Sequence, residues 1–324
     1  MRHESIHLLF TSSGRRVALL QKFKETYQRC FIEGKVITAD HSPTAPTAFF
    51  ADQHYIVPKV TDPMYVEELL RICRQESITM LIPLIDSELT LLAGHRSRFE
   101  DIGVKLFLSS SELNEISCDK NKTYRFFSEH AVPTPKVYGR EELDSGEYAF
   151  PLLIKPLDGS SSKGVTKINN ERELRFFMDY IPNAMVQEFV SGDEYTVDVM
   201  VDFRGRVKTV VPRLRVETRA GEVSKGITKM DRAIIEAVER VVRVLPGPAG
   251  CLTLQCFKQD NGEITFIEIN PRFGGGIPLS IEAGADFPLW TLQLARGEQF
   301  ADTDFSWGDE ITMLRYDDAV YRRA

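Results

Sequence analysis

The first third of the chain alternates short apolar runs with segments whose apolar residues recur at helical spacing. Such an alternation is typical of a parallel β-sheet that helices cover on both faces. The strands are predicted over residues 6–10, 35–40, 80–85 and 104–109, and the helices over 17–27, 64–76 and 88–99. The sequence therefore predicts an N-terminal α/β domain.

Polar residues gather where these strands end, which is where parallel sheets bind ligands. The side chains concerned are Ser12, Ser13 and Arg15 beside Gly14, then Asp40, and finally Asp86 and Glu88. They have two interpretations of equal weight. They line a substrate site, or they cap helices, with Asp86 or Ser87 as the N-cap of the third helix.

The pattern changes after residue 108. A helix is predicted over 109–130, a connector or edge strand over 132–138, and strands over 151–156 and 185–190. Two antiparallel strands (194–202 and 206–211) and a long helix (229–245) follow. Residues 251–270 are predicted to form a hairpin with a turn at Asn261–Gly262.

The end of that hairpin carries the first candidate chemistry, in the stretch FIEINPRFGGG. Side chains alternate along a strand, so Glu268 and Asn270 share one face, and Gln255 on the partner strand joins them. Carboxylate and carbonyl oxygens are the ligands that Mg²⁺ prefers. The alternative is a solvated strand face, but that predicts mixed polar residues rather than three oxygen ligands.

Lys155 is the one charge inside the apolar run PLLIKP. It either extends to the edge of the core or meets a phosphate. The loop that follows, 158–164, is rich in small residues whose main-chain N–H groups can bind phosphate oxygens. It is not a Walker A loop, because no Gly-Lys-Ser/Thr ends it, and it is weak support for nucleotide binding by itself.

The stretch QEFVSGDE supplies a third element. Gln187, Glu188 and the main chain of Val190 lie where a strand edge could bind a purine, and Glu194 could accept hydrogen bonds from a ribose. Without the other elements, this stretch would be a hairpin with acidic residues.

In order, Lys120, Lys155, the glycine-serine loop, QEFVSGDE, Gln255 and EINPR resemble the ATP-grasp superfamily. The similarity is greatest to the branch of carbamoyl-phosphate-synthase large subunits and carboxylate–amine ligases. The resemblance implies an α/β and α+β fold: a pre-ATP-grasp domain with a Rossmann-like parallel sheet (1–110), a small lobe with the phosphate lid (111–190) and a large C-terminal lobe (191–324).

The resemblance also implies a role for each matching position. The nucleotide would be bound by Lys120, Lys155, Gly159, Ser160, Ser161, Ser162, Gly164, Gln187, Glu188, Val190 and Glu194. The metal ligands would be Gln255, Glu268 and Asn270, and the catalytic cations Arg272, Lys155 and Arg215. Arg213, Arg215 and Lys225 are expected in a loop that faces the substrate, and the glycines at 274–276 let the backbone pass close to the acyl acceptor or make a tight turn.

The implied activity is an ADP-forming ligase. A substrate carboxylate attacks ATP, and an amine or a thiol then displaces phosphate from the acyl phosphate. The implied cofactors are ATP and two Mg²⁺ ions, which Mn²⁺ could replace. The alternatives are a non-catalytic ATP-binding module and a single-unit kinase of a small carboxylate. A full carbamoyl phosphate synthase would have two such units, and this chain has one.

The amino-acid composition limits the partners and the cellular compartment that we expect for this activity. The net charge is −7 and the basic residues are scattered, which disfavours a nucleic-acid partner. Five cysteines without a CxxC pair indicate free thiols in a reducing cytoplasm. No apolar run is long enough for a membrane span. The partners are therefore expected to be small molecules, and homodimers are common in the family. A nicotinamide site is disfavoured because TSSGRR is not GxGxxG.

Overall fold

The computed structural model describes residues 5–157, 164–219 and 221–322. Its N-terminal sheet has five parallel strands in the order β3-β2-β1-β4-β5. They are β1 (Ile6–Thr11), β2 (Gly34–Asp40), β3 (Gln53–Ile56), β4 (Met80–Pro83) and β5 (Lys105–Leu106). The helices of this part are α1 (Val17–Arg29), η1 (Pro46–Phe49), α2 (Tyr65–Gln75), α3 (Asp86–Gly94) and α4 (Arg96–Glu100).

The two faces of this sheet are covered by different helices, as the alternation of strands and helices predicted. Leu8 and Phe10 of β1 pack in one core with Phe23 of α1. Leu9 points the other way and packs in a second core with Leu69 of α2. The short edge strand β3 was not predicted, because its residues are only half-buried or exposed and show no apolar run.

A four-stranded antiparallel sheet, which we call the small sheet, has the order β6-β9-β7-β8. Its strands are β6 (Val137–Tyr138), β7 (Leu152–Pro156), β8 (Thr166–Ile168) and β9 (Ala184–Glu188), and its helices are α7 (Arg140–Ser145) and α8 (Glu171–Tyr180). The helix predicted over 109–130 is in fact two helices, α5 (Ser111–Cys118) and α6 (Lys120–Glu129). The break falls at Asp119, whose side chain caps α6 by accepting from the N–H groups of Asn121 and Lys122.

A six-stranded antiparallel sheet, the large sheet, has the order β14-β13-β10-β11-β12-β15. Its strands are β10 (Asp193–Val201), β11 (Val207–Arg219), β12 (Glu222–Thr228), β13 (Gly250–Lys258), β14 (Ile264–Asn270) and β15 (Thr312–Leu314). The helices are α9 (Arg232–Val244), α10 (Ile277–Glu282) and α11 (Phe287–Ala295). Ile234, Val238 and Val241 recur at helical spacing on α9 and pack in one core with Val199 and Leu252 of the sheet.

One expectation for this sheet is wrong. The segment with Arg213, Arg215 and Lys225 is not a loop, because β11 continues to Arg219 and pairs with β12. Arginines and glutamates alternate with other residues here, and the apolar run that marks a buried strand ends at Val211. The strand continues because its backbone pairs with β12 even where its side chains are half-buried or exposed.

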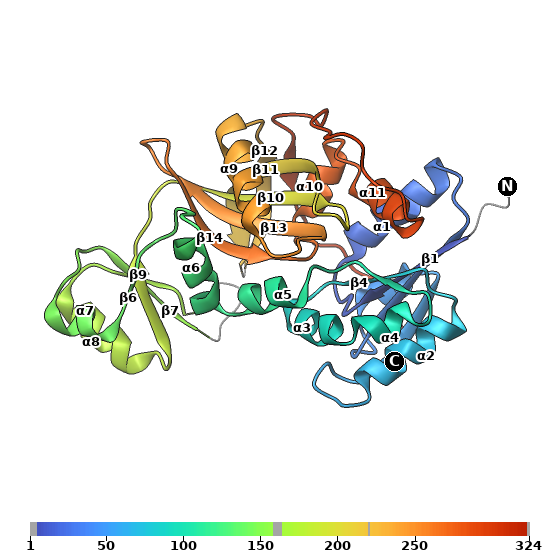
Figure 1. The fold of residues 1–324 in the computed structure, drawn as a ribbon, viewed down its shortest axis with the longest axis horizontal. Helices are drawn as coiled ribbons and strands as arrows, with labels where there is room; N and C mark the ends of the chain where they lie inside the picture. Colours follow the sequence, from blue (N-terminus) through green and yellow to red (C-terminus); the bar gives the residue numbers. More distant parts are fainter. Residues whose placement is uncertain (1–4, 158–163, 220, 323–324) are drawn as a thin grey trace.

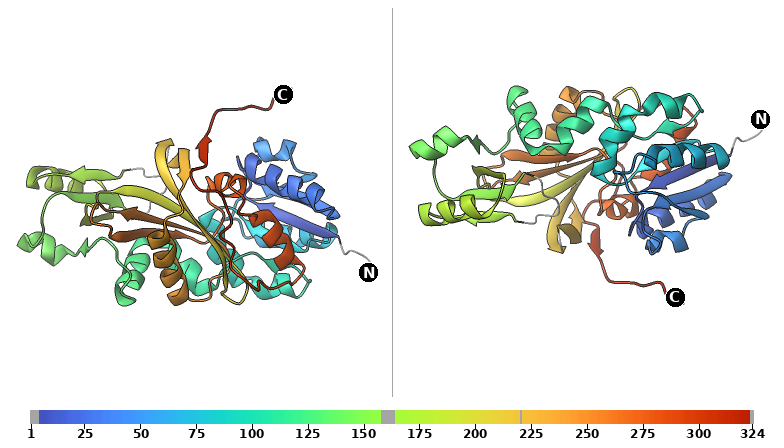
Figure 2. Two further views of the ribbon diagram at one scale, coloured as in Figure 1. Left: turned by 90° about the horizontal axis from the view of Figure 1, so that it is seen from above. Right: turned by 90° about the horizontal axis from the view of Figure 1, so that it is seen from below.

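The three sheets follow one another along the long axis of the molecule. The small sheet lies at one end, the large sheet in the middle and the N-terminal sheet at the other end, and α5 and α6 run beside them (Figure 1). The same order is visible from above and from below (Figure 2). No helix in the described ranges is long and apolar enough to cross a membrane.

A buried ion pair lies inside the large sheet. Arg213 of β11 donates from Nε and Nη2 to the two carboxylate oxygens of Asp198 on β10, at 2.7 and 2.9 Å. The hydroxyl of Ser280 on α10 donates to the same carboxylate at 2.6 Å. Both charged side chains are almost completely buried (1% and 0% exposed). The pair therefore joins two strands and a helix in a place where neither charge can be left alone.

We expect Asp198→Asn to lower the free energy of unfolding by about 3 kcal/mol, because it leaves the Arg213 guanidinium buried without a counter-charge. Urea unfolding of the two proteins measures the difference. Asp193→Asn, an exposed position of the same strand, is the matched control and is expected to cost less than about 0.5 kcal/mol. A loss as small as the control's would show that Asp198 does not compensate Arg213.

Candidate active site

The β13–β14 hairpin brings three predicted metal ligands together. Gln255 lies directly opposite Glu268, and Asn270 lies two residues further along β14, opposite Thr253. Positions opposite each other in an antiparallel pair share a face, so the shared face predicted from the sequence is confirmed. The metal-binding role of these residues stays a prediction.

The oxygen atoms on this face differ in what they already bind. The Glu268 carboxylate has no hydrogen bond or ion pair with any residue in the described ranges. The Gln255 Oε1 accepts from Arg215 at 3.1 Å, and the Asn270 Oδ1 accepts from Arg272 at 3.1 Å. An amide oxygen has a second lone pair, so each can still face a cation.

This donor set fits Mg²⁺ bound together with phosphate. No group of three or more acidic, histidine or cysteine side chains suited to a metal occurs among the described residues. One carboxylate and two amide oxygens leave the coordination shell of Mg²⁺ incomplete, and that ion usually completes it with water and substrate phosphates. The hairpin is thus suited to an ion that arrives with a nucleotide.

Lys155 of the small sheet lies close enough to the β13–β14 hairpin to interact electrostatically with Glu268. It lies on β7 opposite Met185 of β9. Burial lowers the pKa of Lys155 to about 8, the Glu268 carboxylate acts to raise it, and Lys120 lowers it further. Lys120 itself donates to the main-chain oxygen of Leu157 at 2.6 Å. A cation of the small sheet and a carboxylate of the large sheet therefore act on each other across the boundary between the two sheets.

The predicted purine edge lies next to β7 in the small sheet. Gln187 is buried and Glu188 accepts from the main-chain N–H of Lys136 at 3.0 Å. The main chain of Val190, just past the end of β9, forms no hydrogen bond within the described part of the protein. Its N–H and C=O groups are therefore available for a ligand.

Glu194, the predicted ribose acceptor, already has a protein partner. Its carboxylate forms an ion pair with Arg215 at 2.7 Å. Burial raises the pKa of Glu194, the Arg215 charge acts to lower it, and the nearby Glu268 raises it. Arg215 thus links the expected ribose residue to the expected metal ligand Gln255.

The predicted phosphate lid falls only partly within the described residues. Gly159, Ser160, Ser161 and Ser162 lie outside the described residues. Gly164 is described, and its φ of +73° lies in the left-handed region that favours glycine.

Arg272 joins the hairpin to the N-terminal sheet. Its Nη2 donates to the Asp86 carboxylate at 2.9 Å as well as to Asn270. Asp86 is the first residue of α3, and Ile85 is the N-cap position. Neither Asp86 nor Ser87 caps this helix, so the capping interpretation is wrong for them. Asp86 instead orients the predicted catalytic arginine.

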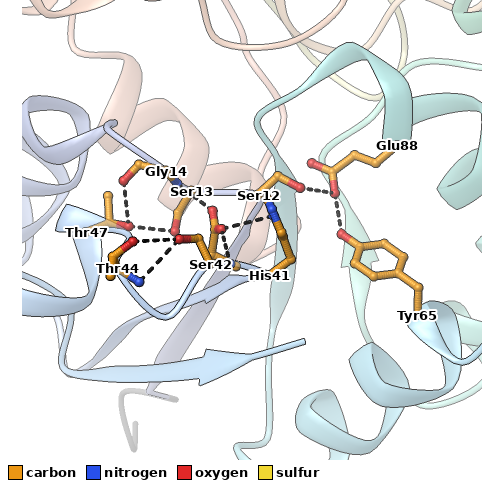
Figure 3. A network of polar contacts seen from close by, with 10 residues as sticks. Ser12, Ser13, Gly14, His41, Ser42, Thr44, Thr47, Tyr65 and Glu88 are labelled. Atoms are coloured by element: carbon orange, nitrogen blue, oxygen red, sulfur yellow. Dashed lines mark hydrogen bonds and ion pairs between the residues drawn. The ribbon is translucent and has the colours of Figure 1, made fainter. Parts of the chain in front are cut away.

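Glu88 has a structural role in the same region. It is completely buried, accepts from the main-chain N–H of Leu84 at 3.0 Å, and receives hydrogen bonds from Ser12 (3.1 Å) and Tyr65 (2.5 Å) (Figure 3). Burial raises the pKa of Glu88. This carboxylate fixes the loop after β1 and is not exposed to a substrate.

Glycine is required at the three positions 274–276 because a larger residue would clash with neighbouring side chains. None of them has φ in the left-handed region. A Cβ on Gly275 would lie 2.8 Å from Nη1 of Arg16, and one on Gly276 would lie 2.3 Å from Nη1 of Arg213. A Cβ on Gly274 would lie 3.0 Å from the Thr253 hydroxyl. The glycines therefore make room for side chains of other elements, rather than forming a turn of unusual φ.

Sequence reasoning missed Arg16, Glu222 and Arg315, which lie beside this glycine segment. Arg315 donates to Glu222 at 3.1 Å and to the main-chain oxygen of Gly275 at 2.9 Å. Arg16 stands next to Arg15 at the end of the first strand, and that strand end was the only signal for it. Glu222 and Arg315 lie far away in the sequence and carried none.

Comparisons with known proteins agree with this architecture. Residues 8–107 match the family described as "PylC-like, N-terminal domain", and residues 117–276 match the family "ATP-grasp domain". The L-amino acid ligase from Bacillus licheniformis superposes with a TM-score of 0.71 at 16% identity, over 95% of this chain and 78% of that one. At this identity the likeness shows the shared fold, which confirms the fold expected from the sequence.

Two relatives by sequence are ligases or synthases. The D-alanine–D-alanine ligase of Fusobacterium nucleatum is 26% identical over 185 residues, which are 54% of this chain and 63% of that protein. The arginine-specific carbamoyl phosphate synthase large chain of Bacillus subtilis is 23% identical over 238 residues. That match covers 67% of this chain and only 22% of the relative.

The lowered pKa of Lys155 predicts a pH-dependent stability. Between about 8 and the ordinary value of 10.5, the unfolded chain holds a proton that the folded chain has released, so raising the pH favours folding. Relative to Lys155→Met, the wild type should gain up to about 1.4 kcal/mol of unfolding free energy per pH unit above pH 8. Urea unfolding from pH 7 to 9.5 measures this, with Lys122→Met on α6 as the control for loss of a lysine. A difference between wild type and Lys155→Met that is constant with pH would contradict the prediction.

Proposed function

The chain belongs to the ATP-grasp superfamily, and from this premise we propose that it is an ATP-dependent, ADP-forming ligase. It joins a small carboxylate to an amine, or to a thiol, through an acyl phosphate. One observation carries the proposal: Lys155 of the small sheet and Glu268 of the large sheet act on each other electrostatically. A bound Mg²⁺–phosphate group has both charges that this arrangement needs, the anion for Lys155 and the cation for Glu268.

The residues of the small sheet and of the large sheet bind different parts of the nucleotide and its metal ion. The main chain of Val190 binds the purine, and Lys120 and Lys155 bind the phosphates. Gln255, Glu268 and Asn270 would hold Mg²⁺, and the bound ion would offset negative charge on the phosphate oxygens. Glu194 exchanges its Arg215 partner for the ribose, and Arg215 then remains beside Gln255 as a cation.

In the proposed reaction, Arg272 is the side chain that contacts the reacting groups of the substrate. Asp86 and Asn270 hold its guanidinium, and its Nε is buried without a partner in the described part of the chain. A fixed cation at this position binds the substrate carboxylate and stabilises the charge of the acyl phosphate. Attack by the second substrate then displaces phosphate. Positioning and charge suffice for such a reaction, so no acid–base histidine is required.

The test is a phosphate-release screen of carboxylates against amines and thiols, with ADP measured in parallel. A ligase should release phosphate only when both substrates are present. Nucleotide binding without release or isotope exchange in any combination would instead indicate a non-catalytic module.

Glu268→Gln should lower the turnover number by roughly 100-fold or more, because it removes the only carboxylate from the proposed metal site. Glu263→Gln is the matched control: it makes the same change on an exposed position of the same hairpin and should leave turnover unchanged. Equal turnover of Glu268→Gln and wild type would refute the proposed metal site.

A further inference from the structure

Charged side chains from five parts of the chain meet beside the glycine segment 274–276. These parts are the loop after β1, the start of α3, the start of β12, the segment after β14 and the residue after β15. We call this group the junction cluster, and it consists of Arg15, Arg16, Asp86, Glu222, Arg272 and Arg315.

Arg16 differs from the other arginines of the cluster. It is half-buried, and its guanidinium forms no hydrogen bond or ion pair with any other residue of the described ranges. The absence of a side chain at Gly275 leaves the room that its Nη1 occupies. The Glu222 and Asp86 carboxylates act on Arg16 electrostatically, but among the described residues neither forms an ion pair with it. A guanidinium that is partly removed from water without a direct partner is costly, so an anionic ligand can complete this arrangement.

The two carboxylates of the cluster form ion pairs with its other three arginines. The Glu222 carboxylate lies 3.1 Å from Arg315 and 3.7 Å from Arg15. The Asp86 carboxylate binds Arg272 at 2.9 Å. Four guanidinium groups therefore face two carboxylates, and the cluster has a surplus of two positive charges.

The protonation equilibria are consistent with this surplus. Burial and the neighbouring Arg272 lower the pKa of Arg16 to about 10. Burial acts to raise the pKa of Glu222, but Arg16, Arg315 and Arg15 together hold it below its ordinary value. The cluster disfavours further positive charge and favours an anion.

The loop that carries Arg16 is held in place before any ligand arrives. Its Gly14 N–H donates to Asp40 at 2.8 Å, and the Ser13 hydroxyl pairs with that of Thr47 at 2.7 Å. The Ser12 hydroxyl donates to Glu88 on the other side (Figure 3). A cation fixed in this way loses little freedom when it binds an anion.

We propose that the junction cluster binds a second anionic group of the substrate, and that Arg16 is the residue that contacts this group. The inference rests on the proposed function, in which Arg272 takes the carboxylate that is activated. Arg16 follows β1 of the N-terminal sheet and lies beside Gly275, whereas Lys155 lies on β7 of the small sheet, on the nucleotide side of the proposed site. The substrate class is therefore a carboxylic acid that carries a further carboxylate or a phosphate.

The experiment compares acids with their uncharged counterparts. Binding to the protein with Mg²⁺ and a non-hydrolysable ATP analogue is measured by calorimetry for four pairs: succinate and succinamate, L-aspartate and L-asparagine, L-glutamate and L-glutamine, and O-phospho-L-serine and L-serine. At least one member with the extra anionic group should bind about 10-fold more tightly than its counterpart. The first three pairs test a carboxylate and the last pair a phosphate.

Arg16→Gln should abolish this preference, and Arg16→Lys, which keeps the charge but not the planar fork, should retain part of it. Arg74→Gln, an exposed position on α2, makes the same charge change away from the cluster and should bind as the wild type does. No preference in any pair, or a preference that persists in Arg16→Gln, overturns the proposal.

The two proposals can fail separately. Carboxylate-dependent phosphate release without any anion preference overturns the role of Arg16 and leaves the ligase. An Arg16-dependent preference in a protein that releases no phosphate leaves the anion site and removes the ligase.

Discussion

The bidentate ion pair between Asp198 and Arg213 is the constraint on which the rest of the site depends. Two charges that are almost completely buried must stay paired, since separating them would leave each in a medium of low dielectric constant. Ser280 occupies one carboxylate oxygen, and the Nη1 of Arg213 lies where a side chain on Gly276 would be. The segment between β14 and α10 must therefore pass over the pair as bare backbone, which fixes where β14 ends and where Asn270 and Arg272 stand.

The same segment is where the two halves of the molecule are joined. Gly275 leaves room for Arg16, and Arg272 reaches across to Asp86 at the start of α3. Both N-terminal residues lie at the carboxyl ends of parallel strands, where such sheets place their ligands. In the proposed function, the substrate end of the site is thus built from the N-terminal sheet and the large sheet together, and the nucleotide end from the small and large sheets. Arg272 lies between the two ends.

The sequence predicted those features that depend on local periodicity. Alternation along β14 was enough to place Glu268 and Asn270 on one face, and the alternation of apolar runs was enough for the parallel sheet. The sequence did not predict features that depend on a single polar residue or on a partner far away in the chain. Asp119 divides one predicted helix into two, and β11 extends past its apolar run because β12 pairs with it. The partner of Asp86 and the glycine that makes room for Arg16 come from segments more than 180 residues away, and no local pattern reveals them. The domain boundaries at residues 110 and 190 stay predictions.

The positive charges of the site oppose folding but favour the binding of an anionic ligand. The chain is acidic overall, with a net charge of −7, but Arg16 and Lys155 are cations at the two ends of the proposed site. Placing them there opposes folding, because each is partly removed from water and forms no ion pair within the described ranges. An anionic ligand regains that free energy on binding, and the local positive potential also attracts it. The free energy that these cations cost on folding is therefore available as binding energy for the two anions that the proposed ligase would bring together.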